Sequence, residues 1–197
     1  AKNPVQRFAL TDSGISPRPL LGQPGGQHWL TGVEHTEEGL VTEDPVMREK
    51  MMEKRARKLL QAAQDIPANE KWQLYGDREA TLTIITWGSN KGAVLEALAM
   101  LEEEDIRARA IQLRLLWPFP AKELEAILST AAPLIAVECN CSGQMQSLIK
   151  SQTGRACEHL ILKYSGRPIS GESLYSALKQ IYGGRADARI VLRNPDE

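Results

Sequence analysis

The loop-rich segment at residues 22–39 carries the densest group of side chains that could do chemistry. It reads GQPGGQHWLTGVEHTEEG and offers two imidazoles and three carboxylates, at His28, Glu34, His35, Glu37 and Glu38. Such groups can bind a metal or transfer protons. Their order matches neither H-E-x-x-H nor another zinc spacing. The glycine pairs favour a backbone that approaches another surface closely. We therefore predict that residues 14–39, with apolar Trp29, Leu30 and Val33, form a loop facing a partner subunit or an active site rather than a metal site.

Three further clusters each follow a predicted strand, at residues 88–91 (GSNK), 117–120 (WPFP) and 138–144 (ECNCSGQ). The carboxyl ends of parallel strands meet at one edge of a sheet, so we expect these clusters to converge there. Their ordinary interpretation is turn formation and helix capping. The alternative is a crevice for a ligand or a contact with another subunit or domain. The candidate substrate or partner contacts of the whole chain are Arg18, His28, Glu34, His35, Asn90, Lys91, Glu138, Asn140 and Gln144.

Established catalytic and cofactor motifs are missing from the sequence. There is no Ser-His-Asp order and no nucleophile elbow, and the GSNKG segment is neither G-x-G-x-x-G nor a Walker loop. The three cysteines, Cys139, Cys141 and Cys157, show no C-x-x-C spacing, which argues against a zinc site, an iron–sulfur cluster or a disulfide framework. We therefore assign no catalytic, cofactor-binding or metal residue to this chain alone.

The stretch that best defines the architecture is residues 80–101. A β-rich run ends at Trp87, and the following helix carries apolar residues at helical spacing, Val94, Leu95, Leu98 and Leu101. The pattern continues with strands expected at residues 106–117, 134–138 and 159–163, and with helices between and after them. This alternation predicts an α/β domain over residues 80–185, with three layers and a mostly parallel sheet covered by helices on both faces.

The preceding residues have a different character. Residues 1–43 are rich in Gly and Pro and read as ordered loop with one short strand at residues 5–10. A long helix is predicted over residues 44–64, capped by Asp44 with Pro45 at its first position. We expect residues 65–79 to be a linker. Residues 186–197 form a polar tail, although its ARIVLR stretch could pair with the sheet.

Composition narrows the class of protein further. The chain has 197 residues, 42% of them hydrophobic, and a net charge of −1, so the basic excess typical of nucleic-acid binding is absent. No apolar run approaches the ~18 residues of a membrane span. We expect a cytoplasmic location with reduced thiols. A start without Met or a signal peptide leads us to expect a fragment or a processed chain.

Taken in order, the motifs GISPRPLLGQPGG, TGVEHTEEG, DPVMREKMMEKRARK, TIITWGSNKGAVLEA, WPFP and VECNCSGQM resemble a known family. They are similar to the carboxyl-terminal half of the alpha subunit of 2-oxoacid:ferredoxin oxidoreductases, of the 2-oxoglutarate type, over most of residues 11–183. The resemblance implies that residues 1–64 are the end of the pyrimidine-side domain and its connecting helix. It also implies that residues 80–185 form a domain like the carboxyl-terminal domain of transketolase.

The resemblance implies coenzyme-A-dependent oxidative decarboxylation of a 2-oxoacid in a complete complex. That complex would hold thiamine diphosphate, magnesium and an iron–sulfur cluster, and would pass electrons to ferredoxin. The family's Tyr-Pro-Ile-Thr-Pro motif has no match here, and the diphosphate motif and cluster cysteines belong to the beta subunit. Cys139 and Cys141 also depart from the family's pattern around Asn140, where the first position is more often polar. The chain is thus expected to be inactive alone, to serve assembly and to need that partner; a homodimer is left open.

Two other functions fit the same residues. One is a free-standing binding or regulatory module of the transketolase carboxyl-terminal type. The other is an α/β domain that binds a phosphate-bearing ligand, with residues 88–91 as its anion site at a helix N-terminus. The identity of the 2-oxoacid does not follow from these residues, because those that select it are expected elsewhere in the complex.

Overall fold

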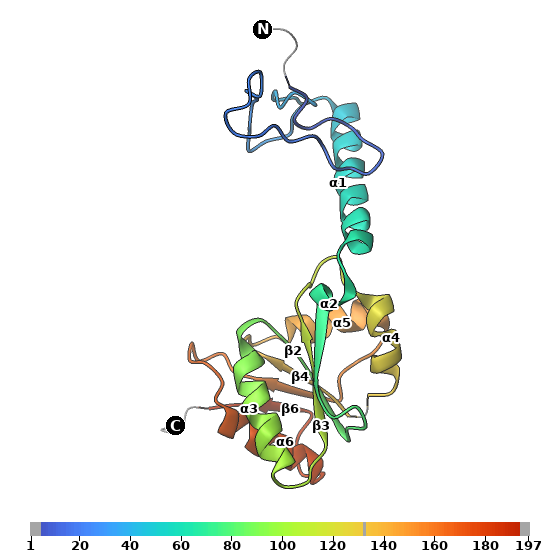
Figure 1. Cartoon of the computed structure of the whole chain (residues 1–197). Helices are drawn as coiled ribbons and strands as arrows, with labels where there is room; N and C mark the ends of the chain where they lie inside the picture. The colour runs from blue at the N-terminus through green and yellow to red at the C-terminus, as the bar shows by residue number, and fades with distance from the viewer. Residues whose placement is uncertain (1–4, 132, 194–197) are drawn as a thin grey trace. The chain divides into compact units, whose positions relative to one another are not determined.

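A computed structural model describes residues 5–131 and 133–193 (Figure 1). The chain divides into two compact units, Ala1–Ile66 and Pro67–Glu197, which we call unit 1 and unit 2. Within the described residues, no helix combines the length and the apolar character that crossing a bilayer requires.

Unit 1 consists of loops and one long helix, α1 (Pro45–Asp65). Asp44 caps this helix as predicted, because its side chain accepts the N–H of Val46 at 3.0 Å. The predicted short strand at residues 5–10 is wrong. In place of a strand ladder, the N–H groups of Phe8 and Leu10 both donate to Glu37, to its carbonyl and to its carboxylate. Glu37 of a second loop therefore contributes two of the hydrogen bonds that hold this segment.

The buried face of α1 is not a simple apolar stripe. Met51 is buried, but Met52, Leu59 and Leu60 are exposed, and the other buried residue is Lys54. A lysine on the covered face of a helix is unusual, because long cationic side chains usually reach solvent.

Unit 2 is an α/β domain with a six-stranded sheet in the order β1-β3-β2-β4-β5-β6. Its strands are β1 (Trp72–Gly76), β2 (Leu82–Trp87), β3 (Ala108–Leu113), β4 (Leu134–Glu138), β5 (His159–Leu162) and β6 (Arg189–Val191). Its helical segments are α2 (Ala68–Lys71), η1 (Gly88–Asn90), α3 (Lys91–Glu102), α4 (Ala121–Ser129), α5 (Gln144–Thr153) and α6 (Gly171–Tyr182). Every neighbouring pair is parallel except β1 with β3.

Two apolar cores lie on opposite faces of this sheet. Helices α3 and α6 pack on one face and α4 and α5 on the other (Figure 1). The strand residues alternate between them, since Ile84 belongs to the first core and Ile85 to the second. The predicted three-layer, mostly parallel α/β class is confirmed.

The ends of the domain differ from the prediction. The expected linker at residues 65–79 contains α2 and the antiparallel edge strand β1, whose Gly76 has a φ of 83° and lies against the Ala108 carbonyl, where a Cβ would collide. In the tail, the ARIVLR stretch that could pair with the sheet does so, because it contributes β6, which pairs with β5. Both β1 and β6 are edge strands with partly exposed residues, so they lack the apolar run that made the buried strand β4 recognisable in the sequence.

Candidate functional site

The switch point of the sheet lies between β2 and β4. The parallel strands follow the order 2-1-3-4-5 when numbered from β2, so the chain leaves β2 and β3 toward opposite faces of the sheet. In doubly wound sheets, ligands bind in the crevice beyond the carboxyl ends of the two strands at this point. Here those ends lead into residues 88–91 and 138–144, two of the predicted clusters.

Asn90 joins the two loops that follow β2 and β4. The sequence predicts it, or Ser89, as the cap of the next helix, but α3 has no side-chain cap. Instead the Nδ2 of Asn90 lies 3.4 Å from the carbonyl oxygen of Val137, which also accepts the Thr86 hydroxyl at 2.9 Å. Asn90 is 7% exposed, so it fastens β2 to β4 rather than facing solvent.

Cys139 completes this link from the β4 side. Its Sγ donates to Oδ1 of Asn90 at 3.0 Å. Although the residue as a whole is exposed, desolvation raises the pKa of its thiol, and the Ile169 N–H and the charge of Lys163 oppose that shift only in part. The thiol therefore stays protonated near neutral pH and acts as a donor, not as a nucleophile.

Glu138 is fully buried, and both of its carboxylate oxygens accept hydrogen bonds. Oε2 accepts the Met145 N–H and the Asn140 amide, both at 2.8 Å, and Oε1 accepts the Gln146 N–H at 3.0 Å. The two N–H groups belong to the first turn of α5, where a helix lacks internal partners and favours negative charge. Glu138 thus anchors the start of α5.

The same turn uses Asn140 as a local cap. Its Oδ1 accepts the N–H groups of Ser142, Gly143 and Gln144 at 3.2, 2.7 and 3.3 Å. Gly143 has a φ of 71°, a conformation that favours glycine. The interpretation of this cluster as turn and capping chemistry is therefore consistent with every hydrogen bond that these side chains make. Gln144, which follows, is exposed.

Lys91 lies away from this network. Its Nζ is 5.1 Å from the centre of the Tyr75 ring, on edge strand β1. Burial raises the pKa of Tyr75, but hydrogen bonds to Lys91 and Arg114 outweigh that effect and lower it overall. Of the three polar side chains that the sequence offers to a phosphate here, Asn90 and Lys91 are thus engaged by Val137 and Tyr75, and Ser89 is exposed.

Of the exposed aromatic side chains at this edge, Trp117 belongs to the predicted cluster at residues 117–120, whereas Trp87 and Tyr164 were not predicted as site residues. Trp87 ends β2, Trp117 follows β3, and Tyr164 follows β5, with exposed fractions of 38%, 55% and 52%. A large aromatic residue at the end of a buried strand or in the loop that follows it is the signal that could have found them. We call this set the aromatic edge; such residues are typical of interfaces.

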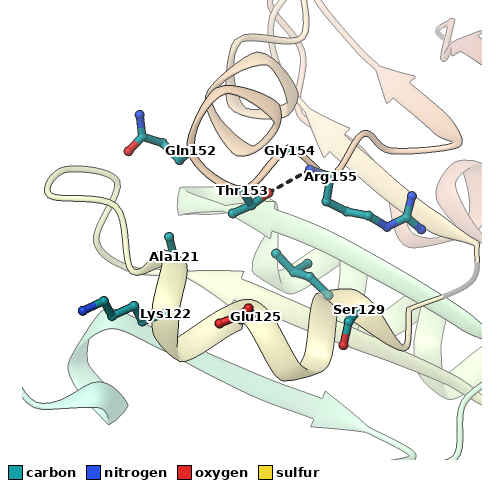
Figure 2. A pocket seen from close by; sticks show the side chains of 9 residues that line it. Ala121, Lys122, Glu125, Ser129, Gln152, Thr153, Gly154 and Arg155 are labelled. Atoms are coloured by element: carbon teal, nitrogen blue, oxygen red, sulfur yellow. Dashed lines mark hydrogen bonds between the residues drawn. The ribbon is translucent and has the colours of Figure 1, made fainter.

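Two cavities of unit 2 lie elsewhere. One, of about 550 Å³, lies between α4 and the end of α5 (Figure 2). Lys122 and Glu125 line it from α4, and Thr153 lines it from α5, accepting the Arg155 N–H at 3.1 Å. The other, of about 590 Å³, lies beside the amino end of β3. Neither coincides with the switch point, so neither supports a ligand there.

The unit 1 candidates form their own network. Glu34 receives both Nη atoms of Arg55, at 2.7 and 3.0 Å, and Nη1 of Arg48 at 2.8 Å. These arginines, Arg55 foremost, lower the pKa of Glu34 to about 2 against a smaller opposing effect of burial. The carboxylate is therefore an ion-pair partner and not a proton donor at neutral pH.

The two histidines and Arg18 lie in different surroundings. His28 hydrogen-bonds through Nδ1 to the Gly26 carbonyl, and His35 through Nδ1 to its neighbour Thr36, with the His35 ring 4.0 Å from that of Phe8. Among the described residues, no three His, Cys, Asp or Glu side chains are close enough to hold a metal ion. Exposed Arg18 lines a cavity that His35 also lines.

Comparison with known proteins now adds a family to this geometry. Residues 80–174 match the family described as pyruvate:ferredoxin oxidoreductase core domain II. The chain is 43% identical to 2-oxoacid:ferredoxin oxidoreductase 2, subunit alpha, of Aeropyrum pernix, over 89% of this chain and 27% of that protein. It is 38% identical to the corresponding alpha subunit of Saccharolobus solfataricus, over 95% of this chain and 29% of that protein.

Two further similarities concern proteins named for 2-oxoglutarate. A solved structure of 2-oxoglutarate:ferredoxin oxidoreductase from Magnetococcus marinus, with 2-oxoglutarate, coenzyme A and succinyl-CoA bound, matches with a TM-score of 0.71 and 31% identity, over 91% of this chain and 31% of that chain. The 2-oxoglutarate synthase subunit KorA of Methanothermobacter thermautotrophicus is 26% identical over 81% of this chain and 42% of that protein.

Unit 2 is thus an α/β domain of the core domain II class found in these oxidoreductases. The chain resembles part of the alpha subunit of 2-oxoacid:ferredoxin oxidoreductases. It spans 27–29% of the length of the two alpha subunits compared above.

Proposed function

We propose that this chain serves assembly within the alpha subunit of a coenzyme-A-dependent 2-oxoacid:ferredoxin oxidoreductase. The whole enzyme would decarboxylate a 2-oxoacid oxidatively and pass the electrons to ferredoxin. The observation that carries the assembly role is the state of the switch point. Both oxygens of Glu138 accept internal hydrogen bonds and the Cys139 thiol is a protonated donor, so neither is available as a base or nucleophile.

We propose 2-oxoglutarate as the substrate of the complete enzyme. The support is indirect and comes from the names of two similar proteins, the Magnetococcus marinus oxidoreductase and the Methanothermobacter synthase subunit. Nothing in the chain's own described residues distinguishes one 2-oxoacid from another. The substrate-selecting residues are expected in the part of the enzyme that this chain does not include.

The complete complex is also proposed to contain thiamine diphosphate, magnesium and an iron–sulfur cluster. The donor sets of the described residues do not fit the two metal groups, because they contain no cluster of three His, Cys, Asp or Glu side chains. No described residue of this chain is therefore assigned to hold either metal group. A cytoplasmic location remains a prediction, in keeping with three free cysteines.

We propose two partner-facing surfaces, one in each unit. In unit 1 the loop at residues 14–39 exposes large apolar side chains, Leu20, Leu21, Trp29, Leu30 and Val33, each more than half exposed. In unit 2 the surface is the aromatic edge. Apolar side chains gathered in one segment mark contact surfaces more often than isolated ones do. The beta subunit is the expected partner, and a second copy of the chain remains open.

Two experiments test this proposal. The purified 197-residue chain should show no 2-oxoacid oxidation with an artificial electron acceptor, with or without thiamine diphosphate. Turnover that depends on thiamine diphosphate and is free of contaminating subunit would contradict the assembly role. In the complete complex, Trp117→Ser with Tyr164→Ser should weaken subunit association, whereas Tyr182→Ser, equally exposed on α6, should not. Equal effects of both changes would contradict a role for the aromatic edge.

A further inference from the structure

One cavity in unit 1 is lined by cations without a carboxylate. It has a volume of about 370 Å³ and lies between α1 and the loop at residues 14–18. Its charged lining consists of five side chains, Arg7, Arg18, Lys54, Arg55 and Lys58, and no Asp or Glu lines it. We call it the basic cavity. Like charges this close raise the free energy of the folded state unless an anion offsets them.

The walls of the basic cavity are held in place by close packing. Gly14 has a φ of 76°, and a Cβ there would lie 2.5 Å from the Lys54 carbonyl oxygen and 2.6 Å from the Lys58 nitrogen. The loop backbone therefore rests directly on α1. Ser16 adds a hydrogen bond from its hydroxyl to the Ala9 carbonyl at 3.0 Å. The cavity is thus built by the fold and does not depend on mobile surface side chains alone.

Lys54 is the most informative residue of the lining. It is 7% exposed, and its ammonium group makes one described hydrogen bond, to the Phe8 carbonyl at 2.7 Å. An ammonium group has three donors, so this bond leaves part of its capacity unused. Burial, followed by the charges of Lys58, Arg55 and Arg7, lowers its pKa, while Glu37 opposes this weakly. An anion in the cavity would offset the lowering of the Lys54 pKa by the charges of Lys58, Arg55 and Arg7.

The other cations differ in how far they are already neutralised. Arg55 is paired with Glu34, and Arg7 lies 5.4 Å from the centre of the Phe8 ring. Arg18 and Lys58 have no ion pair with any residue that the structure describes. Four cations are therefore left for a ligand: Arg18 and Lys58, which are exposed, and Arg7 and Lys54, which are less exposed.

A second cavity of unit 1 provides an internal comparison. It has a volume of about 350 Å³ and is lined by two cations, Arg48 and Arg55, together with Glu34. Glu34 bonds both arginines, so charge is balanced there. The basic cavity shares Arg55 with it, but its other four cations have no ion pair with a described residue, and this difference distinguishes a site prepared for an external anion from a structural ion pair.

We infer that the basic cavity binds the phosphate or diphosphate group of a small molecule. Arginine and lysine together are the usual recognition set for this group, since arginine binds oxygens in pairs and lysine adds a compact charge. The volume exceeds what a phosphate group alone needs, and apolar Ile15, Met51 and Phe8 also line it. Sites of this size and mixed lining accept small organic ligands. The inference concerns unit 1 and shares residues 14–18 with the proposed partner-facing loop, but ligand binding by the isolated chain can be tested separately from subunit association.

The test uses inorganic pyrophosphate and the full 197-residue chain. Calorimetric titration at low salt should show saturable binding at one site. Arg18→Gln and Lys58→Gln should each weaken it about tenfold, because each removes a charge-assisted contact. Lys50→Gln is the matched control: it removes the same charge from α1 outside the cavity and should change the affinity less than twofold. All three positions are exposed, so the variants should fold.

Three results would overturn the inference. They are an absence of saturable pyrophosphate binding to the unaltered chain, an equal loss of affinity in Lys50→Gln, and equally tight binding of succinate. The second would indicate diffuse surface charge, and the third a carboxylate site suited to acidic side chains of another subunit. Lys54→Met adds a second readout: circular dichroism establishes whether it folds, and a folded variant that binds pyrophosphate unchanged would also contradict the inference.

Discussion

The carboxyl edge of the unit 2 sheet and the loop region of unit 1 differ in how far their polar side chains are paired within the fold. At the sheet edge, the side-chain oxygens of Glu138 and Asn140 accept hydrogen bonds from backbone N–H groups of the next turn and helix. In unit 1, Lys54, Lys58 and Arg18 line a cavity that contains no compensating carboxylate. The type of a polar residue alone therefore does not indicate a functional site. What matters is which donors and acceptors remain unpaired after folding.

Removal of the Glu138 carboxylate is expected to have the largest effect on stability. Glu138→Leu leaves two N–H groups of α5 and the Asn140 amide without their acceptor in a buried place, so we expect the free energy of unfolding to fall by about 3 kcal/mol. Urea unfolding followed by circular dichroism measures it. Glu138→Gln, which keeps one acceptor oxygen, should lose less. A loss below about 1 kcal/mol in Glu138→Leu would mean that the edge is not an internal structural network.

Packing of the unit 1 loop on α1 gives the next largest effect. Gly14→Ala introduces a Cβ against the backbone of Lys54 and Lys58 as well as strain at a positive φ, so we expect a loss of about 2 kcal/mol. Gly22→Ala is the matched control, because Gly22 has a φ of 81° with nothing within 4 Å, and its cost should be about 1 kcal/mol. Hydrogen exchange of α1 amides measures both. Equal losses would show that the loop does not rest on α1.

The Glu34 ion pairs predict a pH dependence of unit 1. Its pKa in the folded state is about 2, below the ordinary 4.5, so the stabilisation is present above the unfolded value and is lost as pH falls from about 4.5 to about 2. Arg48 and Arg55 are 57% and 42% exposed, so solvent screening reduces the effect to about 1 kcal/mol. Wild type and Glu34→Gln, compared by thermal unfolding between pH 6 and pH 2, should differ at the upper end and converge at the lower. A constant difference would contradict this origin.

The smallest expected effect on stability is at Lys91. Lys91→Glu removes a cation 5.1 Å from the Tyr75 ring, so the isolated chain should lose only about 0.5 kcal/mol. If the carboxyl edge is a subunit contact, the charge reversal should weaken association with the beta subunit measurably. Melting temperature and sedimentation of the reconstituted complex separate the two. Loss of folding with no separate effect on assembly would mean that this edge is internal structure.

Much of the unit 2 fold could be predicted from the sequence because its core elements carry long, regular patterns. The strand ending at Trp87 and the helix with Val94, Leu98 and Leu101 lie where the pattern places them. Strand β1 was not assigned and β6 was left open, since both are partly exposed edge strands without a buried apolar run and their pairing depends on distant neighbours. The cap at Asn90 was wrong for the same reason: its amide reaches Val137, 47 residues further along the chain.

The sequence by itself determined the three-layer α/β class, the long capped helix and the convergence of two loops at the switch point. These follow from local periodicity, caps and chain direction. Only the tertiary structure decided that Cys139 donates to Asn90, that Glu138 accepts hydrogen bonds from the first turn of α5, and that Lys54 lies buried among other cations. Burial and hydrogen bonding between distant residues depend on how the elements pack, and a list of residue types carries no record of which polar atoms that packing leaves unpaired.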